Sequence, residues 1–349
     1  MINTSSWLGE DDEVLSVSST HDPLGILQST RRVVEQGEQV WINLEQVETL
    51  SQHWLQTGAL KAAMLPSPWD THYHFQDSSE RSVNWILVLD TLNFCFWGEK
   101  NQSRWLVEYE GETLNGYLAE AAALKRAVEE GIPLWDASFL RTMPEDTLAT
   151  ILRGTSPSIP IPLFEQRVQH IREVGQVLLA QFDGQFSHAI EQAQFDALQL
   201  VALLVEHFTS FQDRTVYRNH EVRFFKRAQI CVVDLYNAFQ GQQWGRLHHL
   251  NLLTCFADYK LPQVLRHYSV IEYAPALAQR VDRQEDIQAG SEEEIEIRAA
   301  TIWACELLQR ALHKHGTGVT AAGIDQLLWL TGQEATKMRP YHRTRTIYY

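Results

Sequence analysis

Residues 83–97 place two polar side chains inside a strongly apolar run. The stretch 85–89 is continuously apolar, and Asp90 and Asn93 follow it among three aromatic residues. Burying a carboxylate and an amide in such surroundings is unfavourable unless both find hydrogen-bond partners. We therefore expect 83–96 to form a buried strand whose polar groups either cap neighbouring backbone or belong to a binding site.

Helical periodicity dominates the rest of the chain, especially after residue 113. A short strand is expected at 40–44, and a turn at 98–102 leads from the first buried strand into a second strand at 103–109. The predicted fold class is mainly α, with a small antiparallel β element in the N-terminal half. Helices are expected at 24–37, 45–60, 113–130, 144–153, 164–182, 187–209, 219–240, 244–256, 260–268, 291–315 and 320–331.

The length and composition allow one large domain or two. Of the 349 residues, 44% are hydrophobic, which is enough for a large core. We expect residues 1–20 to form a flexible N-terminal segment and residues 21–349 to form a single large α-rich domain. A cluster of three prolines marks a possible subdomain joint near 154–163.

The net charge of −15 limits the classes of partner. Binding a nucleic-acid polymer normally needs a basic face, so we expect no such partner. Residues 1–13 are polar and acidic, unlike a signal peptide, and no apolar run approaches the length of a membrane span, so no membrane partner is expected. The four cysteines have no paired spacing, which is typical of reduced thiols in a cytoplasmic protein.

Four unusual strings occur in order along the chain: VLDTLNFCFW at 88–97, FFKRAQI at 224–230, FADYKLPQ at 256–263 and PYHRTRTIYY at 340–349. Together they resemble the queuosine salvage protein family, from about residue 25 to the last residue. The resemblance implies a queuosine 5′-phosphate N-glycosylase, which hydrolyses the N-glycosidic bond and releases queuine for salvage into tRNA modification. It also implies a helical fold similar to base-excision DNA glycosylases of the helix-hairpin-helix type.

The implied reaction needs a carboxylate near the ribose C1′, where positive charge develops. Asp258 is our first choice, because it lies at a junction between helical segments within a matching string. Its structural alternative is a helix cap for the segment that begins at Lys260. Asp213 is the second catalytic candidate, and its alternative is an exposed loop acid.

Queuine is a 7-deazaguanine that carries a secondary ammonium and a cyclopentene diol, so a second carboxylate suits its recognition. Asp325 and Asp90 are the candidates, and Asn93 lies in the same string as Asp90. His74 is predicted to hydrogen-bond the base. Aromatic residues that the resemblance covers are candidates for stacking on the heterocycle, although each could instead be core; they are Phe96, Phe211 and Tyr259.

Few basic residues occur in the matching strings, and three of them are candidates for the 5′-phosphate. Lys226 lies on a predicted helix, whereas Arg343 and Arg345 lie two apart in the C-terminal segment. Arginine and lysine make charge-assisted hydrogen bonds to phosphate oxygens. The alternative is structural pairing with the abundant carboxylates. No metal ligand spacing recurs, so we expect no metal and no cofactor.

Two other functions fit the sequence less well. The chain could be a glycosylase that acts on bases in DNA, although its acidic charge opposes this. It could also be a non-catalytic protein that binds queuosine or a nucleotide. Turnover of the nucleotide to free base would distinguish an enzyme from such a binding protein. The partners expected are small molecules: queuosine 5′-phosphate or queuosine as substrate, and queuine as product. The sequence leaves open which substrate is preferred and whether the aspartate attacks covalently.

Overall fold

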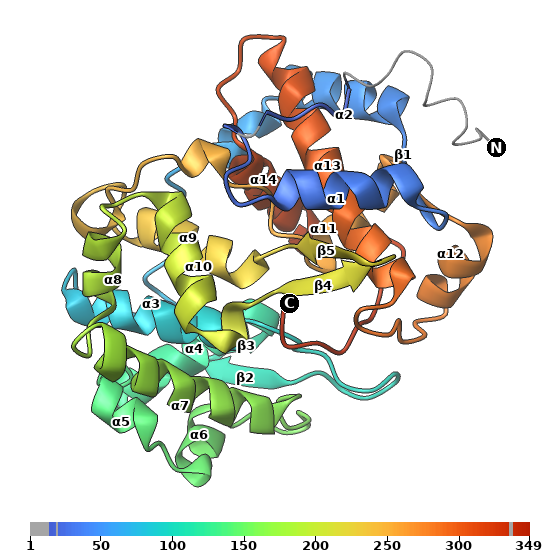
Figure 1. The fold of residues 1–349 in the computed structure, drawn as a ribbon. Coiled ribbons are helices and arrows are strands. Elements are labelled where there is room, and N and C mark those ends of the chain that lie inside the picture. Colours follow the sequence, from blue (N-terminus) through green and yellow to red (C-terminus); the bar gives the residue numbers. More distant parts are fainter. Residues whose placement is uncertain (1–13, 19, 335–337) are drawn as a thin grey trace. The chain divides into compact units, whose positions relative to one another are not determined.

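A computed structural model of the chain describes residues 14–18, 20–334 and 338–349. These residues are mainly helical, with three small antiparallel sheets of two strands each (Figure 1). The predicted flexible segment 1–20 lies largely outside the described residues. Along the parts that the structure describes, no helix is long and apolar enough to cross a membrane.

The chain divides into two compact units, each built from segments distant in sequence. The first unit contains the described residues up to Met64, together with Arg214–Phe224 and Asn251–Arg345. The second unit contains Leu65–Asp213, Phe225–Leu250 and Thr346–Tyr349. The boundaries fall outside the predicted joint at 154–163, and the single-domain organisation stays a prediction.

The first unit is organised around α13, a helix of 22 residues that contacts α1, α2, α11 and α14. Ser291 caps α13 through the amide of Glu294, and acidic residues in its first turn complement the helix dipole. The buried carboxylate of Glu296 accepts from the amides of Gln39 and Val40, which ties α13 to β1. The elements of this unit are α1 (Ile26–Gln36), β1 (Val40–Ile42), α2 (Leu44–Thr57), η2 (Ala59–Ala63), β4 (Arg214–Tyr217), β5 (His220–Arg223), α11 (Lys260–His267), β6 (Ile271–Tyr273), α12 (Pro275–Asp282), α13 (Glu292–His313) and α14 (Ala321–Glu334).

The second unit surrounds α3, which contacts α4, α7, α8 and α10. Close approach of α5 to α7 requires Gly175, because a Cβ there would lie 2.2 Å from the backbone nitrogen of Arg141. The elements of this unit are α3 (Glu80–Leu92), β2 (Leu106–Tyr109), β3 (Glu112–Asn115), α4 (Gly116–Glu129), α5 (Ala137–Arg141), α6 (Glu145–Ile151), α7 (Phe164–Gln181), α8 (Phe186–Gln192), α9 (Ala197–His207), η3 (Thr209–Phe211), α10 (Lys226–Ala238) and η4 (Gln243–Gly245). The short helix η5 (Leu250–Leu252) lies where the second unit passes into the first.

The predicted strand at 83–96 is wrong, because α3 occupies most of that segment. Ser79 caps the helix by accepting from the amide of Arg81, and every residue from Ser82 to Leu92 is buried. A helix buried on all faces has no polar stripe, so its apolar run cannot be distinguished from a buried strand by periodicity. The β element in the N-terminal half is instead the β2–β3 hairpin, in which Leu106 pairs with Asn115.

Most of the other predicted helices are confirmed, with four corrections. The segment 187–209 forms two helices, because Gln194 and Phe195 adopt positive φ angles between α8 and α9. The segment 244–256 contains only 3₁₀ turns. The predicted helices at 113–130 and 219–240 each begin within a hairpin strand, β3 and β5 respectively, and helix starts only afterwards.

Two buried arginines hold the C-terminal end of α3. Arg167 donates to the carbonyl oxygens of Leu92, Phe94 and Cys95. Arg227 donates to the carbonyl of Asp90 (3.1 Å) and to that of Thr91. The last carbonyls of a helix lack partners within the helix, and burial makes it unfavourable to leave them without any. The two guanidiniums therefore allow α3 to end inside the core.

We expect Arg167→Lys to lower the free energy of unfolding by about 3–5 kcal/mol, because an ammonium cannot reach the same set of carbonyls and its partner Glu120 is fully buried. Arg153→Lys is the matched control, since Arg153 pairs with Glu130 at an exposed position. Urea unfolding of both variants measures the difference. Equal midpoints for the two variants would contradict the proposed importance of the buried arginine.

Candidate functional site

Three carboxyl groups converge inside the second unit: Asp90 on α3, Glu120 on α4 and Asp234 on α10. Asp90 is 0% exposed, and neither of its oxygens has a hydrogen-bond partner among the described residues. Burial, together with the nearby Asp234, raises the pKa of Asp90 well above its ordinary value. Lys226 and Asn93 oppose that rise without making a hydrogen bond of good geometry. Asp90 is therefore harder to ionise than an exposed aspartate.

A chain of hydrogen bonds leads from Asp234 through Tyr117 to His74. The Tyr117 hydroxyl lies 3.4 Å from Asp234 Oδ2 and 2.9 Å from His74 Nε2. The other ring nitrogen of His74, Nδ1, lies 2.7 Å from the carbonyl oxygen of Asp70. Burial lowers the pKa of His74 to about 4, so its imidazole is neutral. Burial also raises the pKa of half-buried Asp234 to about 7, which places its titration near physiological pH.

Lys226 and Asp213 meet at the start of α10. The backbone amide of Lys226 donates to Asp213 Oδ2 at 3.2 Å, and the amide of Phe225 donates to the Asp213 carbonyl. Asp213 is only 2% exposed, so the alternative of an exposed loop acid is wrong. Burial lowers the pKa of Arg227 to about 10, and Asp213 and Asp90 oppose that decrease. The second catalytic candidate and the phosphate candidate Lys226 thus share one buried environment with Asp90.

Glu120 is a buried carboxyl group beside Arg167. It is fully buried, lies 3.7 Å from Arg167, and neither oxygen has a hydrogen-bond partner among the described residues. Burial raises the pKa of Glu120 to about 8, although Arg167, Arg227 and Lys226 all lower it. Removal from water therefore outweighs the attraction of three cations, and Glu120 is mostly protonated at neutral pH.

Asp258 lies in the first unit, at the beginning of α11. Its Oδ1 accepts from the amides of Lys260 (2.7 Å) and Leu261 (2.9 Å), so its capping role is confirmed. Two contacts fix the segment before it. Asp325 Oδ2 accepts from the amide of Phe256 at 2.6 Å, and Arg298 Nε donates to the carbonyl of Ala257 at 3.1 Å. The capping bonds and a catalytic role are compatible, because they fix the orientation of the carboxylate.

The C-terminal arginines differ in their surroundings. Arg343 is buried and pairs with Asp286, at 2.9 Å between Nε and Oδ1, which supports the structural alternative for this residue. Arg345 is exposed. The last residues belong to the second unit, where the backbone oxygen of Tyr349 accepts a hydrogen bond from the amide of Cys95 at 3.1 Å.

The predicted stacking residues already have ring partners. Phe96 stacks on Trp105 at 6.3 Å between centroids, and Tyr259 lies 4.7 Å from Tyr341. The guanidinium carbon of Arg227 lies 5.0 Å from the Phe211 ring centroid. Phe96 and Phe211 are also buried, which favours core packing for these two. Tyr259 is only partly buried.

Within the second unit, the structure brings together five predicted residues: His74, Asp90, Asn93, Asp213 and Lys226. Asp258, Tyr259 and Asp325 gather in the first unit. Sequence reasoning missed Tyr117, Glu120, Asp234 and Arg167. A signal existed for the two acids, since each interrupts an apolar helical stretch in the way that Asp90 does.

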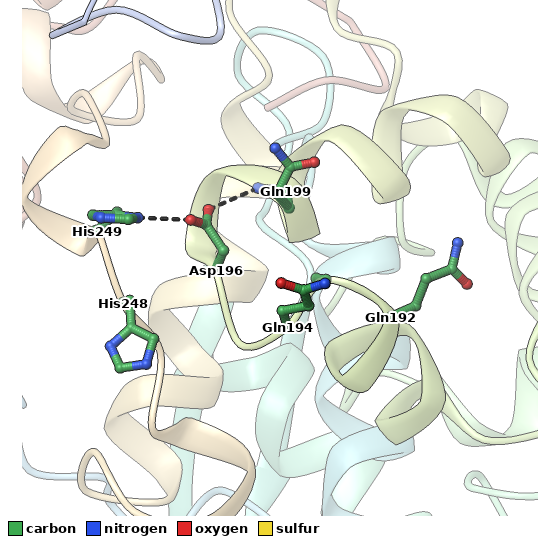
Figure 2. A pocket seen from close by; sticks show the side chains of 7 residues that line it. Gln192, Gln194, Asp196, Gln199, His248 and His249 are labelled. Carbon is green, nitrogen blue, oxygen red and sulfur yellow. Dashed lines mark hydrogen bonds and ion pairs between the residues drawn. The ribbon is translucent and has the colours of Figure 1, made fainter.

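A hollow of about 620 Å³ lies elsewhere on the second unit. Figure 2 shows Asp196 between His249 and Gln199, with Gln192, Gln194 and His248 around the hollow. Asp196 Oδ1 caps α9, and its Oδ2 lies 2.6 Å from His249 Nδ1. Its carboxylate is thereby engaged, and the hollow contains none of the predicted residues. Within the described part of the chain, no group of three or more side chains is arranged to hold a metal ion.

Comparison with known proteins gives one consistent result. The family model described as "Queuosine salvage protein" matches residues 73–349. A protein of Sphaerobacter thermophilus named queuosine 5′-phosphate N-glycosylase/hydrolase is 48% identical over 94% of this chain and 98% of its own length. Proteins with the same name from Bos taurus and Mus musculus are 36% and 31% identical, over 78% and 94% of this chain and over 83% and 99% of their own lengths.

The raised pKa of Glu120 predicts a pH-dependent stability difference. Its folded-state pKa of about 8 exceeds its ordinary value of 4.5. Between these two pH values the unfolded state loses the proton while the folded state keeps it, so the stability of the parent protein falls as pH rises. Glu120→Gln keeps the shape without the ionisation, and we expect it to gain stability relative to the parent from about pH 4.5 to about pH 8. Urea unfolding at several pH values measures this, with exposed Glu108→Gln as the control. A difference that does not change with pH would contradict the prediction.

Proposed function

The chain belongs to the queuosine salvage protein family, and on this premise we propose that it hydrolyses the N-glycosidic bond of queuosine 5′-phosphate. The observation that carries the proposal is the near-full-length similarity to relatives named for this activity. Their shared name favours it over a DNA glycosylase or a non-catalytic binding protein. In the reaction, water adds to the ribose C1′, the bond to the base nitrogen breaks, and a proton passes to the departing queuine.

We propose Asp258 as the carboxylate that faces the developing positive charge at C1′. Its position in the FADYKLPQ string supports this, as do the two amides that hold its Oδ1. A carboxylate fixed before the reaction stabilises charge without reorganising. Asp213 is the second candidate, and its burial beside Lys226 supports it.

We assign recognition of the base to the carboxyl cluster of the second unit and to nearby polar groups. His74, Asp90 and Asn93 are proposed to contact the heterocycle or its substituents. Partial exposure of Tyr259 supports stacking by its ring, with Phe96 and Phe211 as the weaker candidates because both are packed in the core. Asp325 is the second candidate for the ammonium or diol, and its bond to the amide of Phe256 reduces its capacity for this.

For the 5′-phosphate we propose Lys226 and Arg345, with Arg343 less suited because Asp286 pairs with it. The burial of Lys226 strengthens any contact it makes with an anion. A helix-hairpin-helix glycosylase fold and a cytoplasmic location are proposed on the family resemblance, and the mainly helical structure and four buried free thiols support them. A nucleic-acid polymer or a membrane is not proposed as a partner.

The purified protein should release queuine from queuosine 5′-phosphate without added metal, and a chelator should not stop the release. The reason is that the proposed chemistry uses carboxylates of the chain alone. Mass detection of free base, with queuosine as the parallel substrate, measures both activity and phosphate preference. Absence of queuine from both reactions would refute the enzymatic proposal.

Asp258→Asn should abolish most turnover and preserve the fold. Asparagine keeps an oxygen for the amides of Lys260 and Leu261 but removes the negative charge. We expect kcat to fall on the order of a hundredfold or more, with little change in Tm. Asp196→Asn is the matched control, because Asp196 caps α9 in the same manner. A well-folded Asp258→Asn protein with normal kcat would transfer the catalytic role to Asp213.

A further inference from the structure

We propose that Asp90 and Asp234 together form the binding site for the secondary ammonium group of the queuine base. Tyr117 and His74 act in this site as positioning residues that orient Asp234. The inference rests on the proposed function and extends it, because it assigns the charged substituent of the base to two particular carboxyl groups.

The first observation is that Asp90 lacks partners. Its side chain is fully buried, and both oxygens are without a hydrogen bond in the described structure. The Cys231 thiol and the Asn93 amide lie beside it, but neither has hydrogen-bonding geometry. Buried polar groups in native proteins nearly always have partners, and an exception needs an explanation such as a ligand. A hydrogen-bond donor on the bound base provides the partner that the Asp90 oxygens lack.

The second observation is the hydrogen-bonded chain that holds Asp234 near Asp90. The Tyr117 hydroxyl donates to Asp234 Oδ2 at 3.4 Å and lies 2.9 Å from His74 Nε2. His74 Nδ1 lies 2.7 Å from the carbonyl oxygen of Asp70, which fixes the orientation of the ring. Tyr117 and His74 thereby orient the carboxyl group of Asp234.

The third observation is the charge balance around the pair. The groups that face it are Tyr117 and Glu120 from α4 and Lys226, Arg227 and Cys231 from α10. Arg227 is occupied by backbone carbonyls, and Glu120 is mostly neutral. Lys226 balances one ionised carboxyl. A bound ammonium balances the second, so the pair ionises fully only when a cation replaces its proton.

The charge balance favours the ammonium over the diol. Hydroxyl groups bring no charge, so they would leave the second carboxyl without compensation in a buried environment. An N–H donor with positive charge makes the shorter and stronger hydrogen bond to a carboxylate. Asp234 keeps some exposed surface, whereas Asp90 has none.

The test is calorimetric binding of three ligands to the full chain and to Asp234→Asn. Queuine carries the amine and the diol, 7-aminomethyl-7-deazaguanine carries only an amine, and 7-deazaguanine carries neither. We expect Asp234→Asn to weaken the two amines about ten- to a hundredfold and to leave 7-deazaguanine unchanged. Asp196→Asn should change none of them. Loss for queuine alone would assign the diol instead, and equal affinities or equal losses for all three would overturn the proposal.

A pH series provides a second readout that does not depend on the Asp234→Asn variant folding. In the parent protein, affinity for both amines should rise as the pH passes through about 7, because alkyl ammonium groups keep their proton there while Asp234 ionises. Tyr117→Phe removes a hydrogen bond that lowers the pKa of Asp234, so its midpoint should move to higher pH. Affinity independent of pH in the parent would overturn the proposal.

Base release by the parent protein is measured separately, which distinguishes the two proposals. If the parent releases queuine while Asp234→Asn binds both amines normally, the ammonium site is wrong and the proposed function stands. If the parent releases no base but binds amines in an Asp234-dependent manner, the ammonium site stands and the hydrolytic proposal fails.

Discussion

The second unit depends on two buried guanidinium groups at the end of one buried helix. Arg167 and Arg227 together donate to five backbone carbonyl oxygens between Asp90 and Cys95. The centroid of the Phe94 ring lies 4.2 Å from the guanidinium carbon of Arg167 and 5.1 Å from that of Arg227. Without these donors α3 could not end within an apolar core. Because the segment is fixed in this way, Asp90 stays buried at the end of α3, where its backbone carbonyl is bonded and its side chain is not.

A cluster with so many buried ionisable groups is unfavourable unless the charges nearly cancel. Protonation achieves much of this in the free protein, because burial raises the pKa of Glu120 to about 8 and that of Asp234 to about 7. Such carboxyl groups reduce stability at neutral pH relative to ordinary acids. Strained or unpartnered polar groups of this kind are typical of binding and catalytic sites, where a ligand completes the interactions.

Sequence reasoning predicted the mainly helical class and most helices, but it could not predict how α3 is buried. Asp90 was singled out correctly as a polar group in an apolar run, yet the run was interpreted as a strand because a helix covered on all sides shows no amphipathic period. Tyr117 escaped notice because its importance comes from tertiary contact between α4 and α10, which no local pattern encodes. The two arginines look like surface residues in the sequence, since only the fold reveals the carbonyls they bind.

The central claim is that Asp90 lacks partners because the ligand provides them. The most direct measurement is a crystal structure of the protein with queuine bound. The account predicts the ammonium nitrogen within about 2.7–3.2 Å of a carboxyl oxygen of Asp90 and of Asp234. A bound queuine whose ammonium points to solvent or pairs elsewhere, with the Asp90 oxygens still unbonded, would contradict it.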